Sequence, residues 1–556
     1  MAAIQLARSA SPPSRPRWVL IFALVVMLVT SLPYLLGFAL QGDSQRFTGF
    51  LFGVEDGNSY IAKMLSGSAG AWTFKTPYTT LPQSGFGMFL PYLLLGKLAA
   101  PPGLHEQLVV LYHLFRALAG VLMIFASYDF LAFFIPSEAL RRFGLILITL
   151  GGGLGWILVA AGQGQWLGSL PLEFYSPETF GFLSLFGLPH LAAGRALLLW
   201  ALLEYLKLMG SRDALQQPGK TALKLSLLWF GAGLFQPLAM LVIGYVIAIH
   251  LAGIAIWQLG QKASSRAVDW SAWKRTARLA AAAGVLPAVF VVYNAWISLG
   301  DPFGKAWTAQ NIITSPHPAH YLLAFGLLMP YAWLGGRYLL RLDAWKGWLP
   351  VAWALSLPLL AYLPVNLQRR LPEGEWVVWV LLAVAGLQGA AQSRSVRSKA
   401  APLLLLFPST LLLIAGGLVT TLNPAPPVYR PAGETAAFEA LQTLAVSDPV
   451  ILCAYDTGNA LPAWAPARVV IGHGPESVDL ARLRLEVERF FQASTQNAQR
   501  RDLIAQQGVT HIFWGPAERH LGGWDPGTAD YLRQVYQAGE YTIYQVLDAP
   551  ALALSE

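Results

Sequence analysis

Long apolar stretches recur along most of the chain and constrain its fold more than any other feature. The first runs from Trp18 to about Leu40, and ten more follow near 107–134, 143–161, 188–209, 224–235, 238–258, 279–298, 319–338, 348–364, 377–391 and 400–421. The hydrocarbon core of a bilayer, about 30 Å thick, requires about 20 predominantly apolar residues in a crossing helix. The pattern predicts a polytopic α-helical membrane protein with about eleven transmembrane helices.

The composition excludes several other classes. Of the 556 residues, 55% are hydrophobic and only 12% are charged, whereas soluble domains carry about 25% charged residues. This excludes a disordered chain, a basic nucleic-acid-binding protein and an ordinary cytosolic enzyme. Cys453 is the only cysteine, so the chain forms no intramolecular disulfide, and a cysteine-based zinc site is disfavoured.

The basic residues predict the orientation in the plasma membrane. Arg and Lys concentrate before the first apolar stretch and in every second connection, at 141–142, 207–224, 262–278, 337–346 and 394–399. Cytoplasmic loops carry such an excess, so we expect the N-terminus inside and the C-terminal tail outside. The first stretch exceeds the apolar core of a signal peptide, and no small-x-small cleavage site follows it. We therefore interpret it as an uncleaved helix, and the net charge of +8 as a record of orientation.

Two segments need separate treatment. The apolar stretch 224–258 has basic residues on both flanks, which requires two passes with a break near Gln236-Pro237. The stretch Phe86–Ala99 is interrupted by Pro91 and Lys97. A crossing there would reverse every later loop, so we expect an interfacial or re-entrant segment.

The composition changes at about Asn423, which suggests two domains: a transmembrane part, 1–422, with a large outside loop at 41–106, and a soluble tail, 423–556. The tail holds nine Arg, no Lys and fifteen acidic residues. After a Pro-rich linker, helices at 434–446, 480–491, 497–507 and 528–538 alternate with strands at 449–452, 468–471, 510–513 and 541–546. This alternation predicts a small α/β domain with a largely parallel sheet, outside the membrane.

Within the tail, Gly472-His473-Gly474-Pro475 follows a strand, where an open α/β sheet can bind a ligand. The segment matches no phosphate-binding motif, and a plain turn is the favoured interpretation. His473, His511 and His520 show no recognisable metal-ligand spacing.

Polar residues gather at the outer ends of the expected helices. They are Glu55, Asp56, Tyr60, His113, Arg116, Glu178, His190, Lys305, Asn311, Arg369 and Arg370. An ionisable group at membrane depth costs about 2.5–3.5 kcal/mol on insertion scales, so it usually faces a cavity or a partner. The set predicts one outward-facing polar cavity. Each residue alone has a simpler explanation, namely solvation at the outer end or snorkelling to the interface.

The first outside loop carries a family resemblance. Glu55-Asp56 follows the first span, then come Tyr60, Gly70 and Trp72 and a Pro-Tyr-Leu-Leu-Leu-Gly run from Pro91. This arrangement resembles the GT-C membrane glycosyltransferases, especially bacterial members of unassigned substrate. The tail segments Gly458–Ala463, Gly472–Gly474, Glu518-Arg519 and Ile543-Tyr544 add to the likeness. The sequence departs from the family in two ways. The acidic pair has the order Glu-Asp instead of Asp-Glu, and Pro91 stands alone where the family often has a Pro-Pro pair after the loop.

The resemblance implies transfer of a sugar from a polyprenyl-phosphate carrier to an acceptor hydroxyl on the outer face, the acceptor being a lipid, a glycan or a protein. Such chemistry needs a carboxylate base. The resemblance implies Asp56 as this base, with Glu55 as the alternate or as an acceptor-binding group and Asp43 as a further candidate. Cations must stabilise the leaving phosphate. The candidates are Arg369 and Arg370, then Arg116, Lys305 and His190. Glu178 and Asn311 are candidates for sugar hydroxyls, and Tyr60 and His113 for the same cavity. This chemistry requires no metal, although some relatives use a divalent ion.

Other interpretations stay open. The same cavity suits a transporter or flippase for a lipid-linked or anionic envelope substrate, and the chain also suits a non-catalytic relative. Transporters usually show internal repeats, and the sequence shows no convincing repeat of two halves. The single large outside loop also favours an enzyme. Asp56 also fits a turn with Gly57, and Arg369-Arg370 also fits lipid-headgroup anchoring.

Overall fold

The computed structural model of the chain describes residues 15–209, 216–263, 270–390, 396–443 and 448–547. Four of the basic residues that predict the orientation, Arg8, Arg212, Arg266 and Arg394, lie outside these ranges. The chain forms two compact units, each built from three segments. Unit 1 comprises Met1–Ser31, Leu114–Tyr293 and Ile312–Gly416, and unit 2 comprises Leu32–His113, Asn294–Asn311 and Gly417–Glu556.

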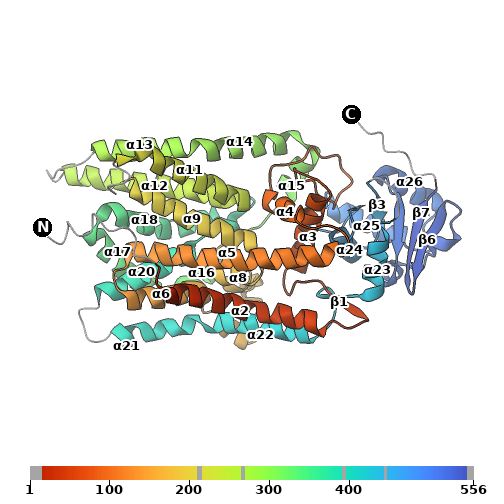
Figure 1. Cartoon of the computed structure of the whole chain (residues 1–556), viewed down its shortest axis with the longest axis horizontal. Coiled ribbons are helices and arrows are strands. Elements are labelled where there is room, and N and C mark those ends of the chain that lie inside the picture. Colours follow the sequence, from red (N-terminus) through yellow and green to blue (C-terminus); the bar gives the residue numbers. More distant parts are fainter. Residues whose placement is uncertain (1–14, 210–215, 264–269, 391–395, 444–447, 548–556) are drawn as a thin grey trace. The chain divides into compact units, whose positions relative to one another are not determined.

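Long apolar helices confirm a multi-pass, mostly helical membrane protein. Among the described residues, four helical segments have the length and hydropathy to cross a bilayer: α2 (Arg17–Leu40), α5 (Leu104–Phe134), α12 (Pro237–Ala263) and the stretch Ser398–Leu422, which contains α22 (Pro408–Leu422) (Figure 1). A fifth candidate is α13 (Trp270–Ala283) with α14 (Val285–Gly300), a pair bent by 42°. The count of eleven stays a prediction, because many of the expected spans are shorter or broken helices.

Unit 1 is built from helices. Besides parts of the long helices, it contains α6 (Glu138–Leu150), α7 (Trp156–Ala160), α8 (Gly181–Gly187), α9 (Pro189–Lys207), α11 (Pro218–Phe235), α16 (Ala319–Phe325), α17 (Met329–Leu342), α18 (Ala344–Leu355), α19 (Leu357–Tyr362), α20 (Glu375–Gly389) and α21 (Val396–Ala400). α17 packs on α20, and α9 packs on α11. Trp353 and Trp376 are fully buried in its apolar interior.

The structure confirms the predicted helix break near Gln236-Pro237; the two crossings there and the interfacial placement of 86–99 stay predictions. α11 ends at Phe235 and α12 begins at Pro237, so the helix breaks at Gln236. The stretch 86–99 holds only the seven-residue helix α4 (Leu90–Gly96), which begins next to Pro91 and ends just before Lys97. Seven helical residues rise about 10 Å and cannot cross a bilayer.

Unit 2 joins the first loop to the tail. The loop contributes β1 (Gln45–Phe47), α3 (Val54–Ser68) and α4, and residues 294–311 contribute α15 (Pro302–Gln310). β1 pairs antiparallel with β2 (Tyr429–Pro431), which begins the tail. The first loop therefore forms a hydrogen-bonded ladder with a strand almost 400 residues further along the chain.

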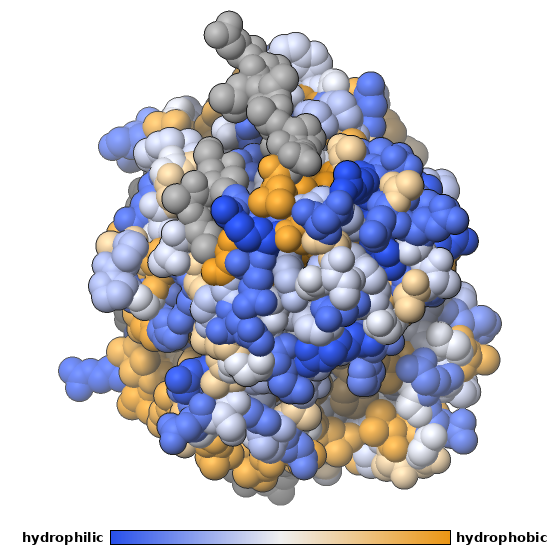
Figure 2. All heavy atoms as spheres, turned by 90° about the vertical axis from the view of Figure 1, so that its right-hand side faces the viewer, coloured by the Kyte–Doolittle hydropathy of each residue, from blue (hydrophilic) through white to orange (hydrophobic). Residues whose placement is uncertain are grey.

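The tail folds as an α/β domain around a five-stranded sheet of order β4-β3-β5-β7-β6. The strands are β3 (Val450–Leu452), β4 (Arg468–Val469), β5 (His511–Trp514), β6 (Leu532–Ala538) and β7 (Tyr541–Val546). The helices are α23 (Ala432–Ala440), α24 (Tyr455–Ala460), α25 (Leu480–Phe490), α26 (Asn497–Gln507) and α27 (Pro516–Leu521). Figure 2 shows the face that β6, β7 and α26 occupy in Figure 1, and hydrophilic residues cover most of it.

Two predictions for the tail are wrong. The sheet is mixed, because β3 pairs parallel with β4 and β5 whereas β7 pairs antiparallel with β5 and β6. The helix expected at 528–538 is instead the strand β6, which forms a hairpin with β7 around Gly539 (φ 57°). As an edge strand with many exposed residues, β6 carries too few apolar residues to show a strand pattern.

Candidate active site

The site begins at α3, where the chain presents two neighbouring carboxylates. Gly53 precedes the helix in the left-handed conformation (φ 55°), and Glu55 and Asp56 occupy the first turn. Negative charge is favourable at a helix N-terminus because of the unpaired backbone N–H groups and the helix dipole. Residues 55, 59 and 63 are spaced by four, so Glu55, Ser59 and Lys63 share one face of α3.

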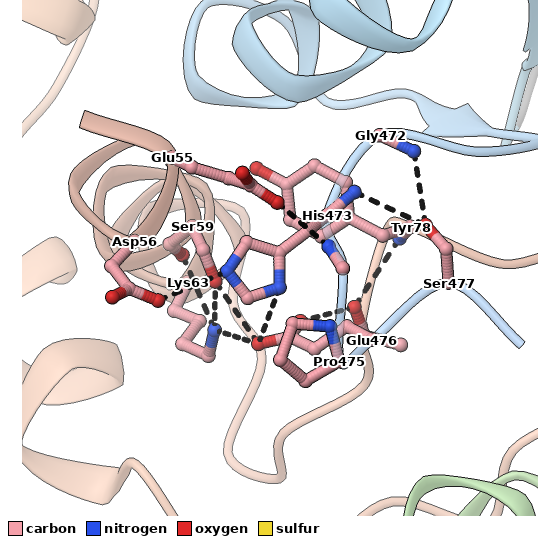
Figure 3. A network of polar contacts seen from close by, with 12 residues as sticks. Glu55, Asp56, Ser59, Lys63, Tyr78, Gly472, His473, Pro475, Glu476 and Ser477 are labelled. Carbon is pink, nitrogen blue, oxygen red and sulfur yellow. Dashed lines mark hydrogen bonds and ion pairs between the residues drawn. The ribbon is translucent and has the colours of Figure 1, made fainter. Parts of the chain in front are cut away.

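Asp56 is exposed and contacts a buried histidine. Its side chain is 56% exposed, whereas that of His473 is 5% exposed, and Oδ1 lies 3.2 Å from Nε2 of His473 (Figure 3). Burial alone would lower the pKa of His473. The charge of Glu476 and the hydrogen bond and charge of Asp56 outweigh burial and hold the pKa above its ordinary value. A protonated His473 donates its Nε2–H to the carboxylate.

Glu55 is fixed by several donors. Its Oε1 accepts hydrogen bonds from the backbone N–H of Gly474, at 2.7 Å, and from the hydroxyl of Tyr455. The amide of Asn459 donates to the backbone carbonyl of Glu55 at 3.3 Å. Burial, followed by the bond to Glu55, raises the pKa of Tyr455, so its hydroxyl stays a proton donor. The two neighbouring carboxylates therefore differ: Glu55 is held by tail donors, and Asp56 is the more exposed.

A buried ion pair joins Lys63, on the same helix as Glu55 and Asp56, to Glu476 of the tail. Nζ of Lys63 lies 2.7 Å from Oε1 of Glu476, and the side chains are 1% and 4% exposed. Ser59 donates to the same oxygen at 3.0 Å, and Thr76 donates to the other oxygen of Glu476. Burial alone would raise the pKa of Glu476, but the charges of Lys63 and His473 and these hydrogen bonds lower it. Each charge in this interior thus has a partner, as buried charges require.

The tail loop that supplies His473 is held by its own contacts. Backbone N–H groups of Gly472 and His473 donate to Oγ of Ser477 at 2.9 and 3.1 Å. The side chain of Gln310, in α15, donates to the carbonyls of Pro475 and Ser477, both at 2.9 Å. Residue 472 must be glycine, because a Cβ there would lie 2.3 Å from the backbone of Gly458. The segment is a turn, as favoured from the sequence, and it also carries the histidine to Asp56.

The described part of the chain groups no three His, Cys, Asp or Glu side chains in a way that could hold a metal ion. The partners of the two carboxylates are N–H and O–H donors: His473 for Asp56, and Gly474 and Tyr455 for Glu55. This donor set suits hydrogen bonding to carboxylates.

No protein-family model matches the sequence, and no curated protein matches it. Solved structures do. ArnT from Cupriavidus metallidurans, in the apo state, has a TM-score of 0.51 at 12% identity, over 95% of this chain and 97% of that chain. The Archaeoglobus fulgidus oligosaccharyltransferase, in the apo form, has a TM-score of 0.50 at 12% identity, over 94% and 74%. This chain has the GT-C fold.

The other predicted residues of unit 2 lie apart from the two carboxylates or make contacts of their own. Tyr60 stacks on Tyr92, with ring centroids 4.8 Å apart, and His113 contacts the carbonyl of Gly49 through Nε2 at 2.9 Å. Asp43 is exposed between α2 and β1, and Lys305 is exposed on α15, which Asn311 ends. Among the described contacts, none joins Asp43, Lys305 or Asn311 to the two carboxylates.

In unit 1 of the GT-C fold, two residues with separate predicted roles contact each other. Nε of Arg370 lies 3.2 Å from Oε1 of Glu178, so the phosphate candidate pairs with the sugar candidate. Arg369 lies over the ring of Tyr175 at 4.4 Å. His190 is half-buried near the start of α9.

Arg116 is held inside unit 1 by hydrogen bonds to neighbouring helices. It is buried, and it donates to the hydroxyls of Thr30 and Ser31 at 3.2 and 2.7 Å and to the carbonyl of Leu185 at 3.0 Å. These bonds join α2, α5 and α8 within unit 1. Because the candidates fall in both units, the single outward cavity stays a prediction.

Four residues of this network are not among those predicted from the sequence, namely Lys63, Ser59, Glu476 and Tyr455, and His473 had no predicted role. One signal was present: Lys63 lies between the apolar pairs Ile61-Ala62 and Met64-Leu65 of α3, where an unpaired charge is costly. No comparable signal marked Glu476, because its partner lies 413 residues away in the sequence.

Proposed function

We propose that the chain transfers a sugar from a polyprenyl-phosphate carrier to an acceptor hydroxyl on the outer face of the membrane, with Asp56 as the base. One observation carries the proposal: in a GT-C fold, the first turn of α3 presents an exposed carboxylate that contacts a buried histidine. The acceptor is a lipid, a glycan or a protein. The tail, 423–556, lies outside in this proposal, and its hydrophilic face in Figure 2 fits contact with water.

The proposed transfer forms one bond, breaks one bond and moves one proton. The acceptor oxygen forms a bond to the anomeric carbon, and the bond from that carbon to the phosphate oxygen breaks. The acceptor proton passes to Asp56, and the electron pair leaves with the polyprenyl phosphate. General base catalysis by a positioned carboxylate contributes about 10²- to 10⁴-fold to such a step.

Asp56 fits the base better than Glu55. Two donors, the backbone N–H of Gly474 and the hydroxyl of Tyr455, already bind Oε1 of Glu55. Asp56 is the more exposed of the two, which an approaching acceptor requires. Glu55 then shapes the site and holds the tail loop through Gly474.

Arg369 and Arg370 remain our candidates for the departing phosphate. Arginine binds phosphate through two parallel N–H bonds, and the side chain of Arg370 is 36% exposed while it pairs with Glu178. A departing phosphate would compete with Glu178 for this guanidinium. The proposed reaction routes no step through a metal ion.

The test uses the full chain in proteoliposomes. Polyprenyl-phosphate glucose, mannose and galactose serve as donors and an envelope lipid extract as acceptor, and mass spectrometry follows the release of polyprenyl phosphate. We expect release with the wild type, and a loss of at least 100-fold with Asp56→Asn. The matched control is Asp502→Asn, an exposed carboxylate on α26, which should keep full activity. Equal release by Asp56→Asn and the wild type would overturn the assignment of the base.

A second measurement addresses the donor class. Deletion of the gene should cause one polyprenyl-phosphate-linked sugar to accumulate, and a plasmid with the wild type should reverse it, whereas Asp56→Asn should not. An unchanged pool of lipid-linked sugars in the deletion strain would contradict a lipid-linked donor.

A further inference from the structure

We propose that His473, contributed by the tail, is the positioning residue for Asp56: it holds one carboxylate oxygen so that the other faces the acceptor hydroxyl. The inference rests on the proposed function, in which Asp56 is the base. It gives the 423–556 domain a direct part in the reaction.

The attachment of the tail loop to α3 is double. His473 contacts Asp56 through Nε2, and the next residue, Gly474, donates its backbone N–H to Glu55 at 2.7 Å. Two successive loop residues thus bind two successive helix residues, and Figure 3 shows His473 beside Asp56. A loop bound at both points cannot shift along α3 without breaking both bonds.

The ring of His473 is also confined. His473 is 4% exposed, and the centroid of its ring lies 5.3 Å from that of the Tyr78 ring. Its backbone N–H donates to Ser477, whose carbonyl accepts from Gln310. A histidine that is buried and bonded at backbone and side chain presents Nε2 in one direction, as a positioning group must.

The charges around His473 favour an imidazolium. The groups that face it are Asp56 and Lys63 of α3, Glu476 of its own loop, and the hydroxyl-bearing ring of Tyr78. Nδ1 lies 3.8 Å from Glu476, and among the described residues it has no hydrogen-bond partner. The two carboxylates flank the ring on both nitrogens, and together they outweigh Lys63 and the burial of the ring.

The orientation of Asp56 should therefore depend on the charge of His473. Above the raised pKa of His473 the ring becomes neutral, and its bond to the carboxylate loses the charge that strengthens it. The turnover number should then fall on the alkaline side, while the KM for donor changes little. A glutamine at 473 keeps an N–H donor but does not titrate.

The experiment has two arms on the full chain in proteoliposomes. In the first, histidine hydrogen–deuterium exchange followed by mass spectrometry gives the pKa of each histidine. We expect the pKa of His473 above 6.5, and a lower value in Asp56→Asn. His520 is exposed on α27 in the same domain and should not change. An unchanged pKa of His473 in Asp56→Asn would overturn the inference, and this arm needs no substrate.

In the second arm, release of polyprenyl phosphate is measured between pH 6 and 9 with the hexose donors above. We expect His473→Ala to lower kcat at least 10-fold. His473→Gln should recover part of that loss and should lack the alkaline limb of the wild-type profile. The matched control, His520→Gln, should keep both the rate and the profile.

The two failures are distinguishable. If Asp56→Asn is inactive while His473→Ala and His473→Gln both keep the wild-type rate and profile, the inference fails and the proposed function stands. If Asp56→Asn keeps the wild-type rate, the assignment of Asp56 as the base fails, and the inference with it. Should His473→Ala not fold, His473→Gln and the exchange arm decide the matter.

Discussion

Nε2 of His473 lies 3.2 Å from Oδ1 of Asp56, although 417 positions separate the two residues in the sequence. Their neighbours repeat the relationship, because Gly474 donates to Glu55. The candidate site of this GT-C fold is therefore built within unit 2 from the first loop and the tail together. Neither segment alone contains both the carboxylates and their donors.

The two carboxylates should respond differently to removal of their charge. Asp56→Asn keeps the shape but removes the base, so kcat for sugar transfer should fall by about 10²- to 10⁴-fold. Glu55→Gln keeps a carbonyl oxygen that still accepts from Gly474 and Tyr455, so kcat should fall by about 10-fold or less. Steady-state release of polyprenyl phosphate in proteoliposomes checks both values. The reverse order of severity would assign the base to Glu55.

Much of this arrangement follows from local sequence patterns. Apolar length predicts the membrane helices, Gln236-Pro237 predicts the break between α11 and α12, and Pro91 with Lys97 predicts the short α4. These features depend on neighbouring residues and on proline geometry. The paired carboxylates after the first span were also predicted, since their place in the sequence marks them.

The partners of these carboxylates could not be predicted in the same way. The bond between His473 and Asp56 and the ion pair of Lys63 with Glu476 depend on how two distant segments pack. Neither follows from propensity or periodicity. The same reason explains the error at 528–538, where the pairing of β6 with β7 decides the structure of a polar segment.

The buried pair of Lys63 and Glu476 should contribute strongly to stability. Lys63→Met leaves the carboxylate of Glu476 buried without its cation, and the loss of one partner of a buried pair costs about 3–5 kcal/mol. Glu476→Gln likewise leaves the ammonium group of Lys63 buried without its anion. The double variant should be less destabilised than the sum of the two singles, because neither charge is then left alone. Thermal unfolding of the detergent-solubilised chain gives the three values.

A matched exposed pair supplies the control. Arg501 and Asp530 lie 2.9 Å apart with side chains 51% and 83% exposed. Exposed pairs contribute about 0–1 kcal/mol, so Arg501→Met should change the midpoint little. Equal losses for Lys63→Met and Arg501→Met would contradict the importance of the buried pair.

Stability should depend on pH at both ends of the network. The pKa of Glu476 is lowered in the folded chain, so its contribution is present above its ordinary pKa of 4.5 and is lost as the pH falls through the folded value. The pKa of His473 is raised, so its contribution is present below 6.5 and is lost as the pH rises through the folded value.

These two groups together favour the folded state most between about pH 4.5 and 6.5. Unfolding midpoints measured from pH 4 to 9 check this expectation. His473→Gln should flatten the decline above pH 6.5, and it should also weaken the acid-side dependence, because the charge of His473 helps to lower the pKa of Glu476. If His473→Gln and the wild type decline in parallel above pH 6.5, the sign of the His473 shift is wrong.

The orientation makes a separate prediction. A periplasmic reporter such as alkaline phosphatase, fused after Thr420, should be active, because the positive-inside distribution places the tail outside. The same reporter fused after Lys207, in a segment predicted to face the cytoplasm, should be inactive. Activity of the second fusion and not of the first would reverse the predicted orientation.

The close contact of α3 with α4 should be sensitive to a single methyl group. A Cβ at Gly96 would lie 1.8 Å from the carbonyl oxygen of Met64, which is backbone and cannot rotate away. Gly96→Ala must therefore push α4 from α3, and overpacking of this kind costs about 1–3 kcal/mol. Gly42→Ala is the control, since a Cβ there meets nothing within 4 Å. We expect a lower unfolding midpoint for Gly96→Ala alone, together with reduced transfer, because α3 carries Asp56. Equal midpoints for the two variants would show that the helices can separate without cost.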